Sequence, residues 1–124
     1  MKTLVLGASL NKERFSNKAI ERLVEFGHEV YAIGNKKGKI SNVIISTDFL
    51  KIENVHTVSI YLSNKIQKLY YNYIVSLKPK RVLFNPGAEN IEFSNILIKK
   101  QIYYENACTL VLLSTNQYES YKSN

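Results

Sequence analysis

The sequence is poor in the residues that mark several protein classes: among 124 residues there are one cysteine, two prolines, five glycines and no tryptophan. A single cysteine excludes a disulfide framework within the chain. No apolar stretch approaches the ~20 residues of a membrane-spanning helix. We therefore expect no membrane partner. The apolar run after Lys2 has the length of a strand and not of a signal-peptide core. We therefore expect a cytoplasmic location.

The chain also lacks internal repeats, linkers and low-complexity segments. Its length suits one domain that can bury a real core, so residues 1–124 are expected to form a single domain. Hydrophobic residues make up 45% and charged residues 22% of the sequence, which is ordinary for a globular protein.

Acidic residues are scarce: 10 Asp and Glu stand against 17 Lys and Arg, for a net charge of +7. Such a balance suits an anionic partner, whether nucleic acid, an acidic surface or a phosphorylated small molecule. The lysines are scattered, with a cluster only at residues 36–39, and no RNA-binding signature appears. We expect no nucleic-acid partner, and a steep loss of nucleic-acid binding with salt would be the sign of one.

Apolar runs alternate with segments of helical periodicity, which predicts an α/β protein with a parallel sheet covered on both faces. Residues 108–113 form an apolar run that fits a strand or a short helix, and residues 114–124 are typical of a polar tail. Strands are expected at residues 3–7, 29–33, 42–45, 56–62, 81–84 and 102–104, and helices at 17–26, 65–77 and 92–100.

The segment from Thr3 to Ile20 carries the first chemical signal. A short apolar strand is followed by a turn of small residues and then by a helix, for which Ser16 is the expected N-cap. Backbone N–H groups at a helix N-terminus can bind phosphate, and small side chains let a ligand approach the backbone. Only the first glycine of the G-x-G-x-x-G fingerprint is present, so an ordinary tight turn stays open as the alternative.

Four loops should meet at the carboxyl edge of a doubly wound sheet, namely residues 7–16, 34–39, 61–64 and 85–90. The loop that follows the second strand has no acidic residue to hold a ribose diol, which disfavours NAD. Its lysines favour a ribose that carries a phosphate, as in NADP or coenzyme A. The candidate phosphate partners are Arg14, Lys18, Lys36 and Lys37.

Residues 7–19 (GASLNKERFSNKA), together with residues 84–90 (FNPGAEN), resemble the paired motifs of small CoA-binding domain proteins, which are similar to the CoA-binding domain of the succinyl-CoA synthetase α subunit. Residues 27–31 also match the family's entry to the second strand, and Cys108 falls where members often carry a cysteine. The chain departs from the family at Gly34-Asn35-Lys36, where many members read Asn-Pro-Lys.

The resemblance implies a Rossmann-like, three-layer α/β domain with a mostly parallel, doubly wound sheet of five to six strands. It implies coenzyme A as the ligand, with NADP or another adenine nucleotide as the runner-up. By position, Gly7, Ala8 and Ser9 would line the phosphates, and Arg14, Phe15, Ser16 and Lys18 would frame the nucleotide. Gly34 and Lys36 would lie at a phosphate, Tyr61 would border the adenine or pantetheine, and Asn85, Pro86, Gly87, Ala88, Glu89 and Asn90 would close the far wall.

Two kinds of function stay open. The first is a module that binds a small nucleotide ligand without catalysis. Such a module could act as a monomer or as a homo-oligomer, and the sequence leaves both open. The second is an enzyme acting on an acyl-CoA or a nucleotide with Glu89 as acid or base. No second carboxylate, metal cluster or nucleophile–base pair supports the enzyme, so no catalytic residue and no metal ligand is assigned. Cys108 could pair with a ligand thiol, or be a small buried apolar residue.

Overall fold

The core of the molecule is a seven-stranded sheet, which the computed structural model describes within residues 1–120. The strand order is β3-β4-β2-β1-β5-β6-β7, and each neighbouring pair is parallel except β3 with β4. From central β1 the chain winds first toward β2 and then back toward β5, so the two halves diverge beside β1. The strands are β1 (Thr3–Ala8), β2 (Val30–Gly34), β3 (Gly38–Ile40), β4 (Val43–Ser46), β5 (Thr57–Ile60), β6 (Arg81–Phe84) and β7 (Tyr103–Asn106).

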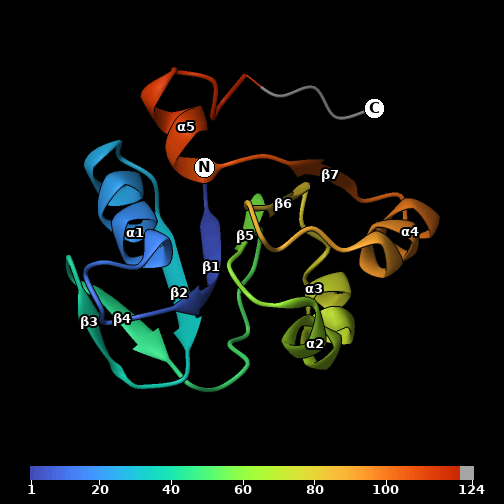
Figure 1. The fold of residues 1–124 in the computed structure, drawn as a ribbon, viewed down its shortest axis with the longest axis horizontal. Helices are drawn as coiled ribbons and strands as arrows, with labels where there is room; N and C mark the ends of the chain where they lie inside the picture. Colours follow the sequence, from blue (N-terminus) through green and yellow to red (C-terminus); the bar gives the residue numbers. More distant parts are fainter. Residues whose placement is uncertain (121–124) are drawn as a thin grey trace.

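Helices cover both faces of this sheet, with α1 and α5 on one side and α2, α3 and α4 on the other (Figure 1). Alternate residues of β1 serve the two faces, as expected for a strand buried on both sides. Leu4 and Leu6 pack with Phe93 of α4, whereas Val5 packs with Ile20 of α1. The helical elements are α1 (Phe15–Glu25), α2 (Asn64–Gln67), the 3₁₀ turn η1 (Lys68–Tyr70), α3 (Tyr71–Leu77), α4 (Ile91–Lys99) and α5 (Thr109–Ser114).

The three-layer α/β architecture is therefore confirmed, but the sheet has seven strands where five to six were expected. The additional strand is β3, which pairs antiparallel with β4 in a hairpin. Ser41 and Asn42 join the two strands with φ of 46° and 68°. Two-residue hairpin turns need such positive φ values, and Asn-Gly or Asp-Gly is their usual sequence signal. Ser-Asn is a weaker turn signal, so the strand at residues 38–40 was not predicted from the lysine-rich loop that precedes it.

The prediction of one continuous helix at residues 65–77 was wrong. The helix is interrupted by η1 between α2 and α3. Ile66 and Leu69, whose spacing fits the inward face of one continuous helix, are 41% and 70% exposed. The N-cap of α2 is Ser63, whose hydroxyl accepts a hydrogen bond from the N–H of Ile66.

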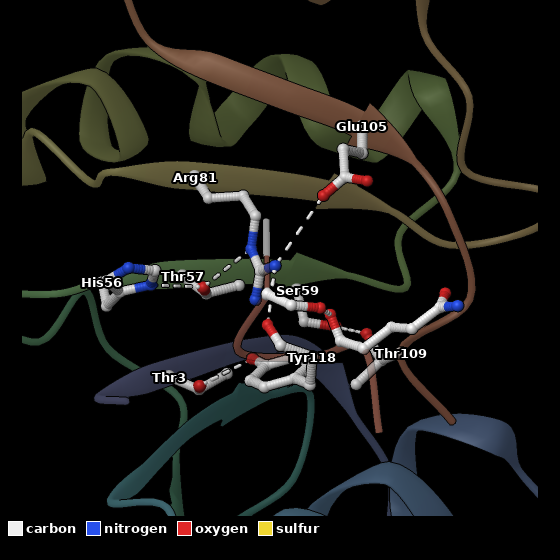
Figure 2. A network of polar contacts seen from close by, with 10 residues as sticks. Thr3, His56, Thr57, Ser59, Arg81, Glu105, Thr109 and Tyr118 are labelled. Carbon is white, nitrogen blue, oxygen red and sulfur yellow. Dashed lines mark hydrogen bonds and ion pairs between the residues drawn. The ribbon is translucent and has the colours of Figure 1, made fainter. Parts of the chain in front are cut away.

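The expected polar tail was also wrong in its described part, because Tyr118 is only 2% exposed. Its hydroxyl lies 2.8 Å from the hydroxyl of Thr3, and its ring lies 4.6 Å from the guanidinium carbon of Arg81 (Figure 2). The segment after α5 thus closes the amino edge of the sheet. Residues 121–124 of the expected tail lie outside the described residues.

Within residues 1–120 no helix combines the length and the apolar character that crossing a membrane requires. The longest, α1, has 11 residues.

The amino edge predicts a pH dependence of stability through His56. Burial, together with the nearby charge of Arg81, lowers the pKa of this half-buried histidine from 6.5 to about 4. The unfolded chain therefore binds a proton at a higher pH than the folded protein does, and stability is lost as the pH falls through this range. Because the imidazole is partly solvated, we expect a loss of about 1–2 kcal/mol in the free energy of unfolding between about pH 7 and pH 4.5, measured with urea.

A His56→Asn variant is the control, because it removes this titration and leaves the carboxylates in place. Burial also lowers the pKa of His28 at the same edge, so the variant should keep part of the pH dependence. Equal pH profiles for the variant and the natural protein would contradict the assignment to His56.

Candidate functional site

A cavity of about 530 Å³ opens at the carboxyl edge of the sheet, which we call the edge cavity. It lies over the ends of β1, β2 and β5, where the chain reverses its winding direction. Open α/β sheets bind their ligands at such a point. Its lining consists of Gly7, Ala8, Ser9, Leu10, Asn11, Arg14, Phe15, Ser16, Gly34, Asn35, Lys36, Tyr61, Leu62, Ser63 and Tyr70.

The loop between β1 and α1 is held by its own side chains. The Ser9 hydroxyl accepts a hydrogen bond from the N–H of Asn11 at 3.1 Å, and the Asn11 carboxamide oxygen accepts one from the N–H of Glu13 at 2.9 Å. The buried side chain of Asn17 donates to the Ser9 carbonyl at 2.8 Å. These bonds hold the loop in a fixed conformation, and α1 begins at Phe15, earlier than the expected start at residue 17. The loop is therefore preorganised.

The start of α1 corrects the expected cap. The N-cap residue is Arg14, and Ser16 lies buried inside the first turn. Within the described residues no side chain caps this helix, and its first turn contains no acid. By contrast, α4 is capped by the Asn90 side chain and carries Glu92 in its first turn. Arg14, Phe15 and Ser16 at the start of α1 line the edge cavity, and an uncapped helix N-terminus that carries a cationic residue attracts anions.

Two glycines bring backbone segments together under the cavity. Gly7 has a φ of +88°, and a Cβ there would lie 2.7 Å from the carbonyl oxygen of Tyr61. A Cβ at Gly34 would lie 2.2 Å from the carbonyl oxygen of Ala8. Any side chain at either position would push apart two of the three strands whose ends form the cavity floor.

Most of the site residues expected from the sequence are brought together at this cavity. Lys18 is outside it, with its ammonium 5.6 Å from the centre of the Phe15 ring. The loop of residues 85–90 is also outside it, at the end of β6, one strand farther from β1. The expected residues in the lining are Gly7, Ala8, Ser9, Arg14, Phe15, Ser16, Gly34, Lys36 and Tyr61.

Residues 85–90 reach the cavity wall indirectly, through the fully buried Gln67. The Gln67 amide nitrogen donates to the carbonyls of Leu62 and Ala88, each at 2.8 Å, and its oxygen accepts from the Asn90 side chain at 2.9 Å. Gln67 therefore fixes the wall that follows β5 to the loop that follows β6. Within a predicted helix, nothing in the sequence distinguished this glutamine from a surface residue.

Asn85, expected to contact the ligand, instead forms hydrogen bonds within the fold. Its amide nitrogen donates to the Ser59 hydroxyl at 2.9 Å and to the Ile60 carbonyl at 3.0 Å. Its oxygen accepts from the N–H of Thr109, the first residue of α5, at 2.8 Å. Asn85 thus ties β5, β6 and α5 together behind the cavity. Glu89 is exposed, and its carboxylate accepts a hydrogen bond from the N–H of Gly87 in its own loop.

Tyr61 lines the cavity but buries its hydroxyl away from solvent, and burial raises its pKa. The hydroxyls of Ser59 and Thr109 lie near that of Tyr61 but bond to each other at 2.8 Å, and within the described part of the chain the Tyr61 hydroxyl has no hydrogen bond of good geometry. An unpaired buried hydroxyl costs about 1–3 kcal/mol. We expect Tyr61→Phe to raise the free energy of unfolding by about 1 kcal/mol in urea titrations. A loss of stability instead would mean that the hydroxyl is satisfied, for example by a buried water.

Six lining residues had not been named as ligand contacts. Five of them lie in loops that the topology had already assigned to this edge: Leu10, Asn11, Asn35, Leu62 and Ser63. The sixth, Tyr70, lies in η1, inside the segment that was expected to form one helix. Its exposure to the cavity follows from the break between α2 and α3, for which the sequence carries no local signal.

Among residues 1–120 no cluster of three or more histidine, cysteine or acidic side chains could hold a metal ion. The edge cavity instead offers backbone N–H groups, two cationic side chains and several apolar surfaces. This chemistry suits an anionic organic ligand.

Comparisons with known proteins agree with this geometry. A crystal structure of an uncharacterized protein superposes with a TM-score of 0.90 at 46% identity, covering 94% of this chain and 96% of that one. A hypothetical protein from Pyrococcus horikoshii OT3 (TM-score 0.83, 22% identity, 91% and 81% coverage) and a protein from Thermus thermophilus (0.82, 17%, 94% and 89%) share the fold. No curated protein matches the sequence.

The sequence pattern of the family described as CoA binding domain matches residues 1–114, which include the whole edge cavity and all seven strands. The chain therefore belongs to the CoA binding domain family.

Proposed function

We propose that this chain acts as one domain that binds coenzyme A in the edge cavity, without catalysis. The observation that carries the proposal is the uncapped N-terminus of α1, whose first residues line the same cavity as Arg14 and Lys36. A pyrophosphate there would accept hydrogen bonds from the free N–H groups and be neutralised by the two cations. Family membership supports coenzyme A as the source of that pyrophosphate.

The end of β2 supports a ligand with a further phosphate. Asn35 and Lys36 line the cavity there, in place of the acid that would hold a free ribose diol. Both coenzyme A and NADP carry a phosphate on the ribose, so NADP is the runner-up.

A thermal-shift panel of coenzyme A, NADP, NAD, ATP and AMP tests the proposal. A ligand present at about 100 times its Kd stabilises a protein by about 2.7 kcal/mol, which is several degrees for a chain of this size. We expect the largest shift with coenzyme A and a smaller one with NADP. A larger shift with NAD than with coenzyme A would contradict the proposal.

Charge removal at the cavity should weaken binding selectively. Arg14→Ala and Lys36→Ala are each expected to reduce the affinity for coenzyme A roughly five- to tenfold in calorimetry, because each removes one charged phosphate partner. Lys37→Ala is the matched control, since Lys37 is the adjacent exposed lysine but does not line the cavity. Lys18→Ala should have a smaller effect than Arg14→Ala, through the Phe15 ring. Unchanged affinity in both Arg14→Ala and Lys36→Ala would remove this site assignment.

The enzyme alternative finds no specific support. Glu89 lies outside the edge cavity, and its carboxylate is already engaged within its own turn. Cys108 is the N-cap residue of α5 and also lies outside the lining. Turnover of an acyl-CoA that is lost in Glu89→Gln would nevertheless establish catalysis.

A further inference from the structure

A second hollow, which we call the side groove, lies between the segment of residues 49–54 and α3 and measures about 620 Å³. Five of its nine lining residues are apolar or aromatic, and the other four are polar or charged. The lining consists of Phe49, Leu50, Ile52, Tyr73 and Leu77, with Lys51, Glu53, Asn54 and Ser76.

Aromatic rings connect this groove to the edge cavity. Tyr70 lines the edge cavity, and its ring centre lies 5.1 Å from that of Phe49, which lines the side groove. The Phe49 ring in turn stacks on Tyr73 at 4.7 Å with an interplanar angle of 11°. The three rings form a continuous apolar surface from one hollow to the other. Phe49 remains 54% exposed despite both contacts, so folding alone leaves much of this ring in water.

Both hydroxyl groups in the groove lining already donate hydrogen bonds within the fold. The hydroxyl of Tyr73 already donates to the Leu50 carbonyl at 2.6 Å, and that of Ser76 donates to the Tyr73 carbonyl at 2.6 Å. The exposed Lys51 and Glu53 carry opposite charges. An occupant would therefore gain mainly by burying apolar surface.

From this continuity we infer that the side groove takes the acyl chain of a coenzyme A thioester whose nucleotide occupies the edge cavity. The inference rests on the proposed function and adds its ligand class, an acyl-CoA. The edge cavity holds the cationic partners for phosphate, Arg14 and Lys36, whereas the aromatic and apolar side chains of Phe49, Leu50 and Ile52 in the side groove can contact a hydrocarbon chain. The Tyr70–Phe49 surface is the path between them.

The test is a calorimetric series with coenzyme A, acetyl-CoA, butyryl-CoA and octanoyl-CoA. A fully buried methylene is worth about 0.8 kcal/mol, which corresponds to about a fourfold gain in affinity. Because the groove is open, we expect partial burial and a gain of at least about tenfold from acetyl-CoA to octanoyl-CoA. Octanoate without the nucleotide should neither bind measurably nor compete with coenzyme A.

Two variants locate the chain. Phe49→Ser should remove most of the gain with chain length while keeping the affinity for coenzyme A itself. Val111→Ser is the matched control, because Val111 is also 54% exposed but lies in α5 on the opposite face of the sheet. Ser76→Trp should fill the groove and, like Phe49→Ser, remove most of the gain with chain length while coenzyme A still binds.

The outcomes separate the two proposals. Equal affinities for acetyl-CoA and octanoyl-CoA, with coenzyme A still bound, would overturn the acyl site and leave the proposed function standing. A chain-length gain that survives both Phe49→Ser and Ser76→Trp would also overturn it. Failure of coenzyme A and of every thioester to bind would overturn both proposals together.

Discussion

Gly34→Ala is expected to lower the free energy of unfolding by about 3 kcal/mol and to weaken coenzyme A binding more than tenfold. A methyl group at this position would lie 2.2 Å from the carbonyl oxygen of Ala8. Ala8 and Gly34 are paired residues at the ends of β1 and β2, beside a register shift in β1 between Leu6 and Ala8. The two strand ends have little room to separate, because β1 is almost completely buried and Ile33, next to Gly34 in β2, is also buried. The methyl group must therefore separate the strand ends that carry the cavity floor.

Gly27→Ala is the matched control for this variant. Gly27 has a φ of +84°, and nothing would lie within 4 Å of its Cβ. Its substitution should cost only the backbone strain, about 1 kcal/mol, and should leave binding unchanged. Urea unfolding and calorimetry measure the two effects. If Gly27→Ala were the more damaging of the two, the close approach at Gly34 would not be the controlling feature.

Arg81→Leu should destabilise the protein by about 3–5 kcal/mol. Arg81 is completely buried at the start of β6, where its Nε donates to the Thr57 hydroxyl at 3.1 Å and its Nη1 to the Tyr118 carbonyl at 3.0 Å (Figure 2). The same Nη1 lies 3.7 Å from the Glu105 carboxylate on β7. One guanidinium thus joins β5, β6, β7 and the segment after α5. Leucine would leave the partly buried carboxylate and the Tyr118 carbonyl without this donor.

Two further variants and one control refine this expectation. Arg81→Lys keeps the charge but loses the planar fork, so an intermediate loss is expected. Tyr118→Phe removes the bond to the Thr3 hydroxyl, keeps the ring beside Arg81, and should cost about 1 kcal/mol. Arg22→Leu, at an exposed position of α1, should change stability by less than about 0.5 kcal/mol. Full stability of Arg81→Leu in urea would show that burying the charge costs as much as its contacts return.

The locations of the ligand loops were predictable because they follow from chain order. Once strands and helices alternate, the segments after β1, β2 and β5 must gather at one edge, and these segments supply every lining residue except Tyr70. The hairpin of β3 and β4 was missed because Ser41-Asn42 is a weak turn signal. Tyr118 was missed because a single aromatic residue in a polar segment has no period from which to infer burial.

The second motif shows where local sequence stops being informative. Residues 85–90 were expected to face the ligand, and the structure places them behind Gln67, which connects them to the cavity wall at Leu62. A motif can be distinctive because it positions a neighbouring loop. Sequence alone does not separate that role from direct contact.

The sequence by itself determined the α/β class, the loop that opens on the α1 N-terminus and the lack of an acid after β2. These features depend on periodicity and on residue types at neighbouring positions. Only the tertiary structure decided that Gly34 abuts Ala8, that Gln67 couples two loops, and that Tyr70 and Phe49 connect two hollows. Each of these contacts joins residues far apart in the chain, and their side chains are oriented by the packing of whole elements, which no local pattern encodes.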